Sequence, residues 1–246
     1  MQWSDGHCPS FSPALYSLTP SHSPRVTNTS PDAGLFSGRA PVQFIEHDET
    51  RLVRKQYRRG GLAQHVTKEH YVWTGFSRTR AVREVHLLAD LYASQLPVPR
   101  PVGCKIERNP GRLRDGFGLF YRNWLLTEEI ADCRGLNAVL SASVSDDKKL
   151  PLDWSYIGSE LARFRQANVY HADLNASNIL LDASGSFYLI DFDRARRINN
   201  GSNNKKLHQR MLSRLLRSID KLETQVKGLS VSKADRDKLA SAFWGN

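Results

Sequence analysis

The sequence predicts a two-lobed α+β fold, with an antiparallel sheet in the N-terminal lobe and a reduced helical C-terminal lobe. Short strand-like runs flank one helix candidate in the first half of the chain, and helical spacing of apolar residues dominates the second half. A chain of 246 residues, 40% of them apolar, can bury a core of this size. We expect the lobes at residues 34–130 and 131–246, after a leading segment at residues 1–33.

The leading segment is dense in Ser and Pro and has no helical or strand periodicity. Its small apolar content cannot offset the entropy that ordering would cost, so we expect residues 1–33 to be disordered. The N-terminus also lacks a basic region followed by an apolar stretch, and no apolar run in the chain approaches the ~18–20 residues that span a bilayer. Neither an export signal nor a transmembrane helix is therefore expected.

The N-terminal lobe is expected to be a small sheet with one helix. The strand candidates are residues 42–45, 51–57, 102–106 and 118–126, and the acidic turn HDET separates the first two. Residues 125–130 are expected to cross to the second lobe. Apolar side chains near helical spacing predict a helix over residues 77–94, which ends before Pro97 and Pro99.

Two charged residues of this lobe are candidates for nucleotide binding. Lys55 shares one face of its strand with Val53 and Tyr57 by the two-residue period, so its ammonium could bind a phosphate. Glu84, in the first half of the helix candidate, could pair with this lysine and hold it toward phosphates. The alternatives are a solvated lysine on a strand edge and an ordinary exposed glutamate.

Helical periodicity continues in the C-terminal lobe. Residues 153–168 are expected to form a helix that directs Ile157, Leu161 and Phe164 inward. Residues 206–222 are strongly amphipathic, and we expect their apolar stripe to pack on the core. The opposite face could contact anionic lipid. Its basic residues are Arg210, Arg214, Arg217 and Lys221.

Residues 169–197, VYHADLNASNILLDASGSFYLIDFDRARR, carry the chemistry of the chain. The apolar runs ILLD and FYLI are joined by the turn-rich tetrapeptide ASGS, which predicts a hairpin. If Asp182 pairs with Phe187, antiparallel register places Asn178 opposite Asp191. An amide oxygen and a carboxylate would then meet at the open end of the hairpin, where they suit Mg²⁺ with bound phosphates. The alternative is a surface hairpin with polar caps.

Asp173 lies on the loop that leads into this hairpin. A carboxylate there can accept the proton of a hydroxyl group, or orient the hydroxyl, while a metal neutralises the transferred group. His171 lies two residues earlier. With Asp173 so close, a second base is unnecessary, and we expect His171 to brace the loop.

With HADLNASNILLD and LIDFDRAR beside LVRKQYRRGG and TRAVREVHLL, the chain resembles the Kdo (3-deoxy-D-manno-octulosonic acid) kinases of Gram-negative lipopolysaccharide synthesis. They belong to the lipopolysaccharide kinase branch of the protein-kinase-like fold, and the resemblance covers about residues 35–225. It implies transfer of the γ-phosphate of ATP, with Mg²⁺, to the 4-hydroxyl of Kdo on a lipid A precursor. Matched residue by residue, it assigns Asp173 to the catalytic loop, Asn178 and Asp191 to magnesium, Lys55 to the strand lysine and Glu84 to the helix glutamate.

The chain also departs from the protein-kinase pattern. The usual Asp-Phe-Gly is Asp191-Phe192-Asp193, so the flexible glycine of a switchable segment is lost, and no Ala-Pro-Glu follows. The glycine-rich phosphate loop is reduced to Gly34 and Gly38. A small-molecule or lipid-sugar acceptor therefore fits better than a protein acceptor.

A formal net charge of +10 indicates an anionic partner. Residues 194–227 contain ten Lys/Arg and only two acids, Asp220 and Glu223. Because the acceptor of the resembling family is anchored in a bilayer, we expect a peripheral protein on the cytoplasmic face of the inner membrane. No specific nucleic acid is expected, since zinc-finger and RRM signatures are absent.

Other functions stay open at this point. Sugar, aminoglycoside and choline kinases share the loop pattern, so another small-molecule kinase or an atypical protein kinase is an alternative. An inactive kinase fold and a basic nucleic-acid module are further alternatives. Neither a disulfide framework nor a zinc site is supported, because the chain has no CxxC pair among its cysteines, Cys8, Cys104 and Cys133.

Overall fold

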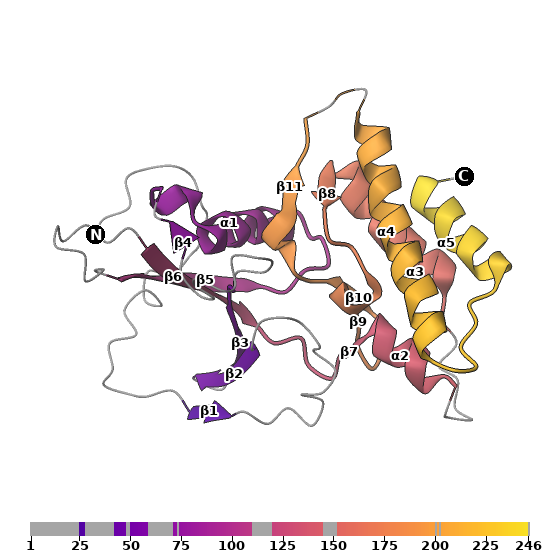
Figure 1. The fold of residues 1–246 in the computed structure, drawn as a ribbon, viewed down its shortest axis with the longest axis horizontal. Coiled ribbons are helices and arrows are strands. Elements are labelled where there is room, and N and C mark those ends of the chain that lie inside the picture. Colours follow the sequence, from indigo (N-terminus) through magenta and orange to yellow (C-terminus); the bar gives the residue numbers. More distant parts are fainter. Residues whose placement is uncertain are drawn as a thin grey trace.

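The computed structural model describes residues 25–27, 42–47, 50–58, 71–72, 74–109, 120–144, 152–199, 201 and 203–245. A sheet with one helix forms one lobe, a group of helices forms the other, and short strands lie between them (Figure 1). This is the two-lobed α+β arrangement predicted from the sequence. The hydrophobic core is continuous across the two lobes.

Six strands of the described chain form an antiparallel sheet in the order β1-β2-β3-β6-β4, with β5 also paired to β6. They are β1 (Arg25–Thr27), β2 (Val42–His47), β3 (Thr50–Gln56), β4 (Tyr71–Val72), β5 (Pro101–Asn109) and β6 (Phe120–Glu128). β3 lies between β2 and β6, so Lys55 is not on a sheet edge.

Two details of this lobe differ from the sequence prediction. β1 lies inside the segment that was expected to be disordered, where it pairs with β2; the rest of residues 1–33 is outside the described residues. β6 continues to Glu128, because Leu125–Glu128 pair with β3. These four residues, which were expected to cross to the second lobe, therefore belong to the sheet. Only the last two residues of the predicted crossing segment, 129 and 130, come after the end of β6.

Helix α1 (Arg80–Ala93) packs on the sheet after a short 3-10 helix, η3 (Phe76–Arg78). Its N-terminus has no cap from its own Thr79 side chain. Instead the buried Asn123 on β6 accepts a hydrogen bond from the Ala81 amide, at 3.1 Å, and satisfies one of the free N–H groups of the first turn. This bond fixes α1 on the sheet, with Glu84 on its buried face.

The C-terminal lobe contains helices α2 (Leu136–Ala142), α3 (Trp154–Gln166), α4 (Asn204–Gln225) and α5 (Lys233–Trp244). The helices predicted at residues 153–168 and 206–222 are present as α3 and α4, whereas α2 and α5 were not predicted. The apolar stripe of α4 is buried, as expected, through Met211, Leu215 and Ile219. Among the described residues, no helix has both the length and the apolar character that crossing a bilayer requires.

The short strands between the lobes are β7 (Arg134–Gly135), β8 (Val169–His171), β9 (Ile179–Leu181), β10 (Phe187–Leu189) and β11 (Ala195–Arg197). β9 and β10 form the predicted hairpin, β7 pairs with β9, and β8 pairs with β11. The chain reaches β9 through the 3-10 helix η4 (Ala176–Asn178) and reaches β11 through the 3-10 helix η5 (Phe192–Arg194).

The register of the hairpin differs by one residue from the prediction. Phe187 pairs with Leu181, and the Ile190 amide donates to the Asn178 carbonyl at 3.0 Å, so Asn178 stands opposite Ile190 and not opposite Asp191. The cause is a three-residue loop. Gly185 adopts a left-handed φ of 84° and its amide donates to the Asp182 carbonyl, the usual geometry of a turn closed by a glycine bulge.

Candidate active site

The catalytic-loop candidate connects β8 to β9. The backbone oxygen of Asp173 accepts hydrogen bonds from the side-chain amides of Asn175 and Asn178, each at 2.9 Å. The Asn175 side-chain oxygen also accepts from the Ser177 amide, at 2.9 Å, and begins η4. These bonds fold the loop back on itself and leave the Asp173 side chain exposed at its surface.

His171 braces this loop from inside the molecule. It is buried, and its Nε2 lies 3.1 Å from the Ile190 carbonyl, directly before Asp191. Its ring meets Phe192 edge-on, with centroids 5.1 Å apart. Burial lowers the pKa of His171, so the imidazole is neutral and Nε2 is the nitrogen that donates to the carbonyl. This position confirms the expectation of a bracing role.

The predicted nucleotide residues come together with one of the predicted metal residues. The Lys55 ammonium lies 3.3 Å from Glu84 Oε1 on α1 and 2.5 Å from Asp191 Oδ1 after β10. Asp191 adopts a left-handed backbone, φ 64°, which an aspartate tolerates better than most residues, and the chain turns there into η5. The alternatives of a solvated edge lysine and an exposed glutamate are wrong, since Glu84 is buried and paired.

The electrostatics of this group favour charged Lys55 and Asp191. Burial opposes the ammonium form of Lys55, but attraction from Glu84 and Asp191 outweighs burial and raises the pKa of Lys55. Burial also opposes the charge on Asp191, and Lys55 outweighs it and lowers the pKa of Asp191. Burial raises the pKa of Glu84 despite the attraction of Lys55.

Glu84 is held in place by donors besides Lys55. The Tyr57 hydroxyl donates to Glu84 Oε2 at 2.5 Å, and the Phe192 amide donates to Glu84 Oε1 at 3.0 Å. One carboxylate therefore links α1 to strand β3 and to the turn that carries Asp191. A buried carboxylate with three donors is stable, whereas a buried carboxylate without partners is costly.

Comparison with known proteins decides the family. Residues 36–243 match the lipopolysaccharide kinase (Kdo/WaaP) family. The chain belongs to this family. It is 37% identical over 232 residues to the 3-deoxy-D-manno-octulosonic acid kinase of Xanthomonas campestris pv. campestris (strain B100). The aligned region covers 87% of this chain and 86% of that protein.

Two further relatives of this chain carry the same name as the first. The protein of Xanthomonas oryzae pv. oryzae (strain PXO99A) is 38% identical over 215 residues, which cover 85% of this chain and 78% of that protein. The protein of Xylella fastidiosa (strain M12) is 35% identical over 207 residues, which cover 84% of this chain and 76% of that protein. Membership of this family makes the chain a phosphotransferase with a kinase-like α+β fold.

Asp193, which replaces the glycine of the protein-kinase pattern, has a partner that sequence reasoning missed. The Arg80 guanidinium of α1 binds both carboxylate oxygens of Asp193, with Nε 2.6 Å from Oδ1. Arg80 also donates to the Tyr71 hydroxyl at 2.9 Å and stacks over the Tyr57 ring. The segment after Asp191 is therefore tied to helix α1 of the N-terminal lobe.

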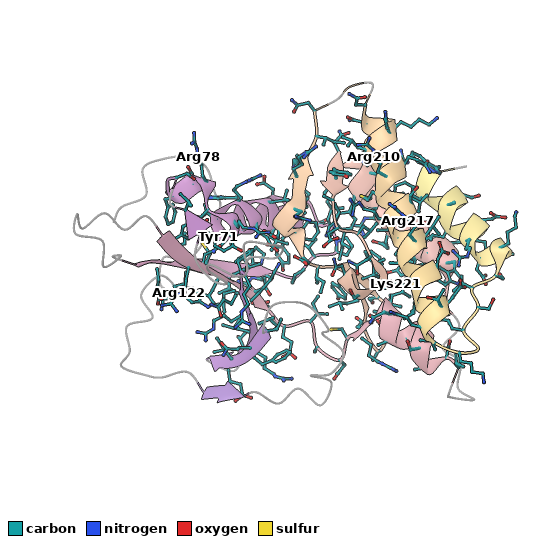
Figure 2. All side chains as sticks on the ribbon, viewed as in Figure 1. Tyr71, Arg78, Arg122, Arg210, Arg217 and Lys221 are labelled. Carbon is teal, nitrogen blue, oxygen red and sulfur yellow. The ribbon has the colours of Figure 1, made fainter. Side chains whose placement is uncertain are left out.

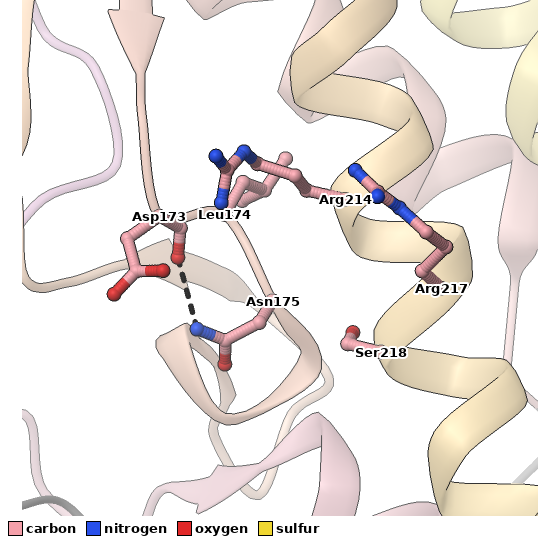
Figure 3. A pocket seen from close by; sticks show the side chains of 6 residues that line it. All are labelled: Asp173, Leu174, Asn175, Arg214, Arg217 and Ser218. Carbon is pink, nitrogen blue, oxygen red and sulfur yellow. Dashed lines mark hydrogen bonds between the residues drawn. The ribbon is translucent and has the colours of Figure 1, made fainter.

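An open pocket of about 290 Å³ lies beside Asp173, between the catalytic loop and α4 (Figure 3). Sequence reasoning assigned the basic face of α4 to lipid and missed this pocket. The pocket is lined by Asp173, Leu174, Asn175, Arg214, Arg217 and Ser218.

The glycine loop expected at Gly34 and Gly38 lies outside the described residues, as do Arg59–Gly61, which come shortly after β3.

Proposed function

We propose that this chain transfers the γ-phosphate of ATP to the 4-hydroxyl of Kdo on a lipid A precursor, in the inner core of lipopolysaccharide. The main support is the contact of Lys55 with Glu84 and Asp191, near the loop that carries Asp173. The chain also matches relatives named as Kdo kinases over most of its length.

Each residue of the site has a role in this proposal. Lys55, held by Glu84, binds phosphate oxygens of ATP as a fixed cation. The exposed carboxylate of Asp173 accepts the proton of the acceptor hydroxyl or orients that hydroxyl toward the phosphate. Little covalent chemistry is required of the protein, so the gain in rate comes from positioning and from neutralising charge.

Asn178 and Asp191 form a donor set that fits Mg²⁺, because both offer hard oxygens. The Asn178 amide nitrogen donates to the Asp173 carbonyl, which fixes the orientation of the amide and leaves its oxygen for a ligand. Within the described chain, no cluster of three or more His, Cys, Asp or Glu could hold a metal, so the nucleotide would supply further ligands. Bound Mg²⁺ would neutralise charge on the phosphates.

The chain is proposed to act at the cytoplasmic face of the inner membrane as a peripheral protein. A basic surface supports this location, because each Lys or Arg near an anionic membrane contributes about 1 kcal/mol of attraction. Figure 2 shows Arg210, Arg217 and Lys221 along α4. The acceptor proposed here is anchored in that membrane, so adsorption would bring enzyme and acceptor together.

Transfer of labelled phosphate from ATP to a mono-Kdo lipid A precursor tests the function. We expect Mg²⁺-dependent labelling of the lipid, and no labelling of a generic protein acceptor offered in parallel. Asp173→Ala, which should leave the fold unchanged because the side chain is exposed, is the matched control and should lower transfer by about 10²- to 10⁴-fold. Labelling of the protein acceptor with no labelling of the lipid would favour an atypical protein kinase.

A further inference from the structure

The pocket beside Asp173 has one acidic wall and one basic wall. Asp173 and Asn175 belong to the catalytic loop, whereas Arg214, Arg217 and Ser218 belong to α4. In Figure 3 the Arg214 side chain extends from the helix toward the loop at Asp173 and Leu174. The volume of about 290 Å³ is just below the usual range of small-molecule pockets, roughly 300–1,000 Å³. This size suits a single sugar ring.

The positive charge of the basic wall is not neutralised within the described chain. The two acids of α4, Asp220 and Glu223, are turned toward α5, where both pair with Arg236, at 2.7 and 2.8 Å. Within the part of the chain that the structure describes, the Arg217 guanidinium donates one hydrogen bond, from its Nε to the Ser213 carbonyl, which leaves four N–H donors. Among the described residues, neither Arg214 nor Arg217 forms an ion pair.

Helix α4 is held in fixed register with the catalytic loop. The Ser218 hydroxyl accepts a hydrogen bond from the Ala176 amide, at 2.9 Å, and the Met211 sulfur accepts one from the His171 amide, at 3.4 Å. Ser218 follows Met211 by seven positions, about two helical turns, so both contacts lie on one face of the helix. Arg214, three residues after Met211 and four before Ser218, therefore has a fixed place relative to Asp173.

We infer that Arg214 and Arg217 bind the carboxylate of an acidic sugar acceptor while Asp173 engages its hydroxyl. Arginine binds carboxylates through paired, parallel N–H donors, and such charge-assisted bonds set orientation as well as affinity. An acceptor held at its acid group by α4 would present a hydroxyl to the loop at a defined position. This assignment rests on the proposed function and names the residues that select an acid among sugars.

A phosphate group of the lipid A precursor offers similar chemistry, so the test must separate the two anions. Three acceptors do this: the intact Kdo-lipid precursor, the same lipid with the Kdo carboxyl converted to an amide, and the same lipid with its phosphates removed. Arg214→Gln and Arg217→Gln are compared with the unaltered protein on all three. Arg210→Gln removes the same charge from the same helix face outside the pocket and reports the effect of general surface charge.

We expect both pocket variants to raise the acceptor KM by about 10- to 100-fold on the intact and the phosphate-free lipid, since hydrogen bonds to charged groups contribute roughly 1.5–3 kcal/mol. The KM for ATP should stay within about twofold, as a role limited to acceptor binding requires. With the amide acceptor, the unaltered protein should already show the raised KM, and the variants should add little. Arg210→Gln should affect the carboxylate and amide acceptors equally.

Two results would overturn the carboxylate assignment. Loss of affinity on the phosphorylated lipids alone would place a phosphate in the pocket, and pocket variants that behave like Arg210→Gln would remove the acceptor from α4. In both cases the unaltered protein still phosphorylates Kdo, so the proposed function stands. Failure of the unaltered protein to label any Kdo lipid would instead reject the proposed function, and this inference with it.

Discussion

The ammonium of Lys55 contacts carboxylates from two distant parts of the chain, Glu84 on α1 and Asp191 after β10. Asp173 forms none of these contacts: its backbone oxygen accepts from Asn175 and Asn178, and its side chain is exposed. The roles proposed for nucleotide binding and for acceptor binding therefore fall on different residues. Substitutions at Lys55 and Asp173 should therefore affect different kinetic constants.

We predict that Asp173→Ala lowers turnover by about 10²- to 10⁴-fold and leaves ATP affinity nearly unchanged, because the carboxylate acts on the acceptor hydroxyl. Lys55→Ala should instead weaken ATP binding, since it removes the cation that we propose binds the phosphates. Calorimetric titration with ATP, together with steady-state kinetics, measures both effects. An equal loss of ATP affinity in the two variants would contradict the division of roles.

Asp191→Asn tests the metal assignment. The amide keeps the shape of the side chain and can still accept from Lys55, so the thermal midpoint should change little. It removes the negative charge that Mg²⁺ requires, and we expect turnover to fall sharply at every Mg²⁺ concentration. The measurement is the activity of the variant across a Mg²⁺ titration. Near-normal rates of the variant at limiting Mg²⁺ would reject the assignment of Asp191 to the metal.

At the scale of elements, the close packing of α3 on α5 depends on Gly158. A Cβ built at Gly158 would lie 2.4 Å from the Leu239 carbonyl oxygen and 2.8 Å from the Ala242 Cβ, so any other residue forces the helices apart. α5 is further joined to α3 by Arg165, whose Nε donates to the Phe243 carbonyl at 2.9 Å. The glycine permits this contact at the cost of local helix propensity.

We predict that Gly158→Ala lowers the free energy of unfolding by about 1–3 kcal/mol, because overpacking outweighs the gain of about 1 kcal/mol that alanine gives in a helix. Chemical denaturation measures this. Ser159→Ala, one residue later on the exposed face of α3, is the control and should change stability by less than about 0.5 kcal/mol. A stabilised Gly158→Ala variant would show that α5 is loosely packed.

The elements differ in how well the sequence predicted them. α3 and α4 followed from strong apolar periodicity, but α5 has only Leu239 and Phe243 buried, so its periodicity is weak. Its start was nevertheless encoded, since the Ser232 hydroxyl accepts from the Asp235 amide at 3.1 Å, which is half of a capping box. The hairpin was predicted, and its register was missed because Gly185 closes a shorter loop than assumed.

The site residues were predictable to the extent that their motif is local. Asp173, Asn178 and Asp191 lie within one short stretch, whereas the Arg80–Asp193 pair joins positions 113 residues apart and has no local signal. The pocket wall was hidden for a related reason. The amphipathic pattern of α4 showed a basic face, but only the contacts of Met211 and Ser218 place that face beside Asp173.

At the scale of the whole molecule, the excess of positive charge is concentrated on α4 and the segment before it. Residues 194–227 contain ten Lys/Arg and two acids, and both acids form ion pairs with Arg236. The basic surface therefore keeps its charge, beside a pocket that opens next to Asp173. An enzyme held by this surface on an anionic membrane would direct the pocket toward lipid head groups.

We predict reversible, salt-dependent adsorption to anionic vesicles. Several basic side chains at about 1 kcal/mol each suffice for adsorption at low ionic strength, and screening should abolish it as the Debye length falls from about 10 Å at 0.1 M salt to about 3 Å at 1 M. Sedimentation with anionic and with neutral vesicles measures this, and a variant with Gln at Arg210, Arg214, Arg217 and Lys221 should pellet less. Pelleting that resists salt would indicate apolar insertion, and no pelleting at low salt would remove the membrane-surface proposal while leaving the kinase assignment intact.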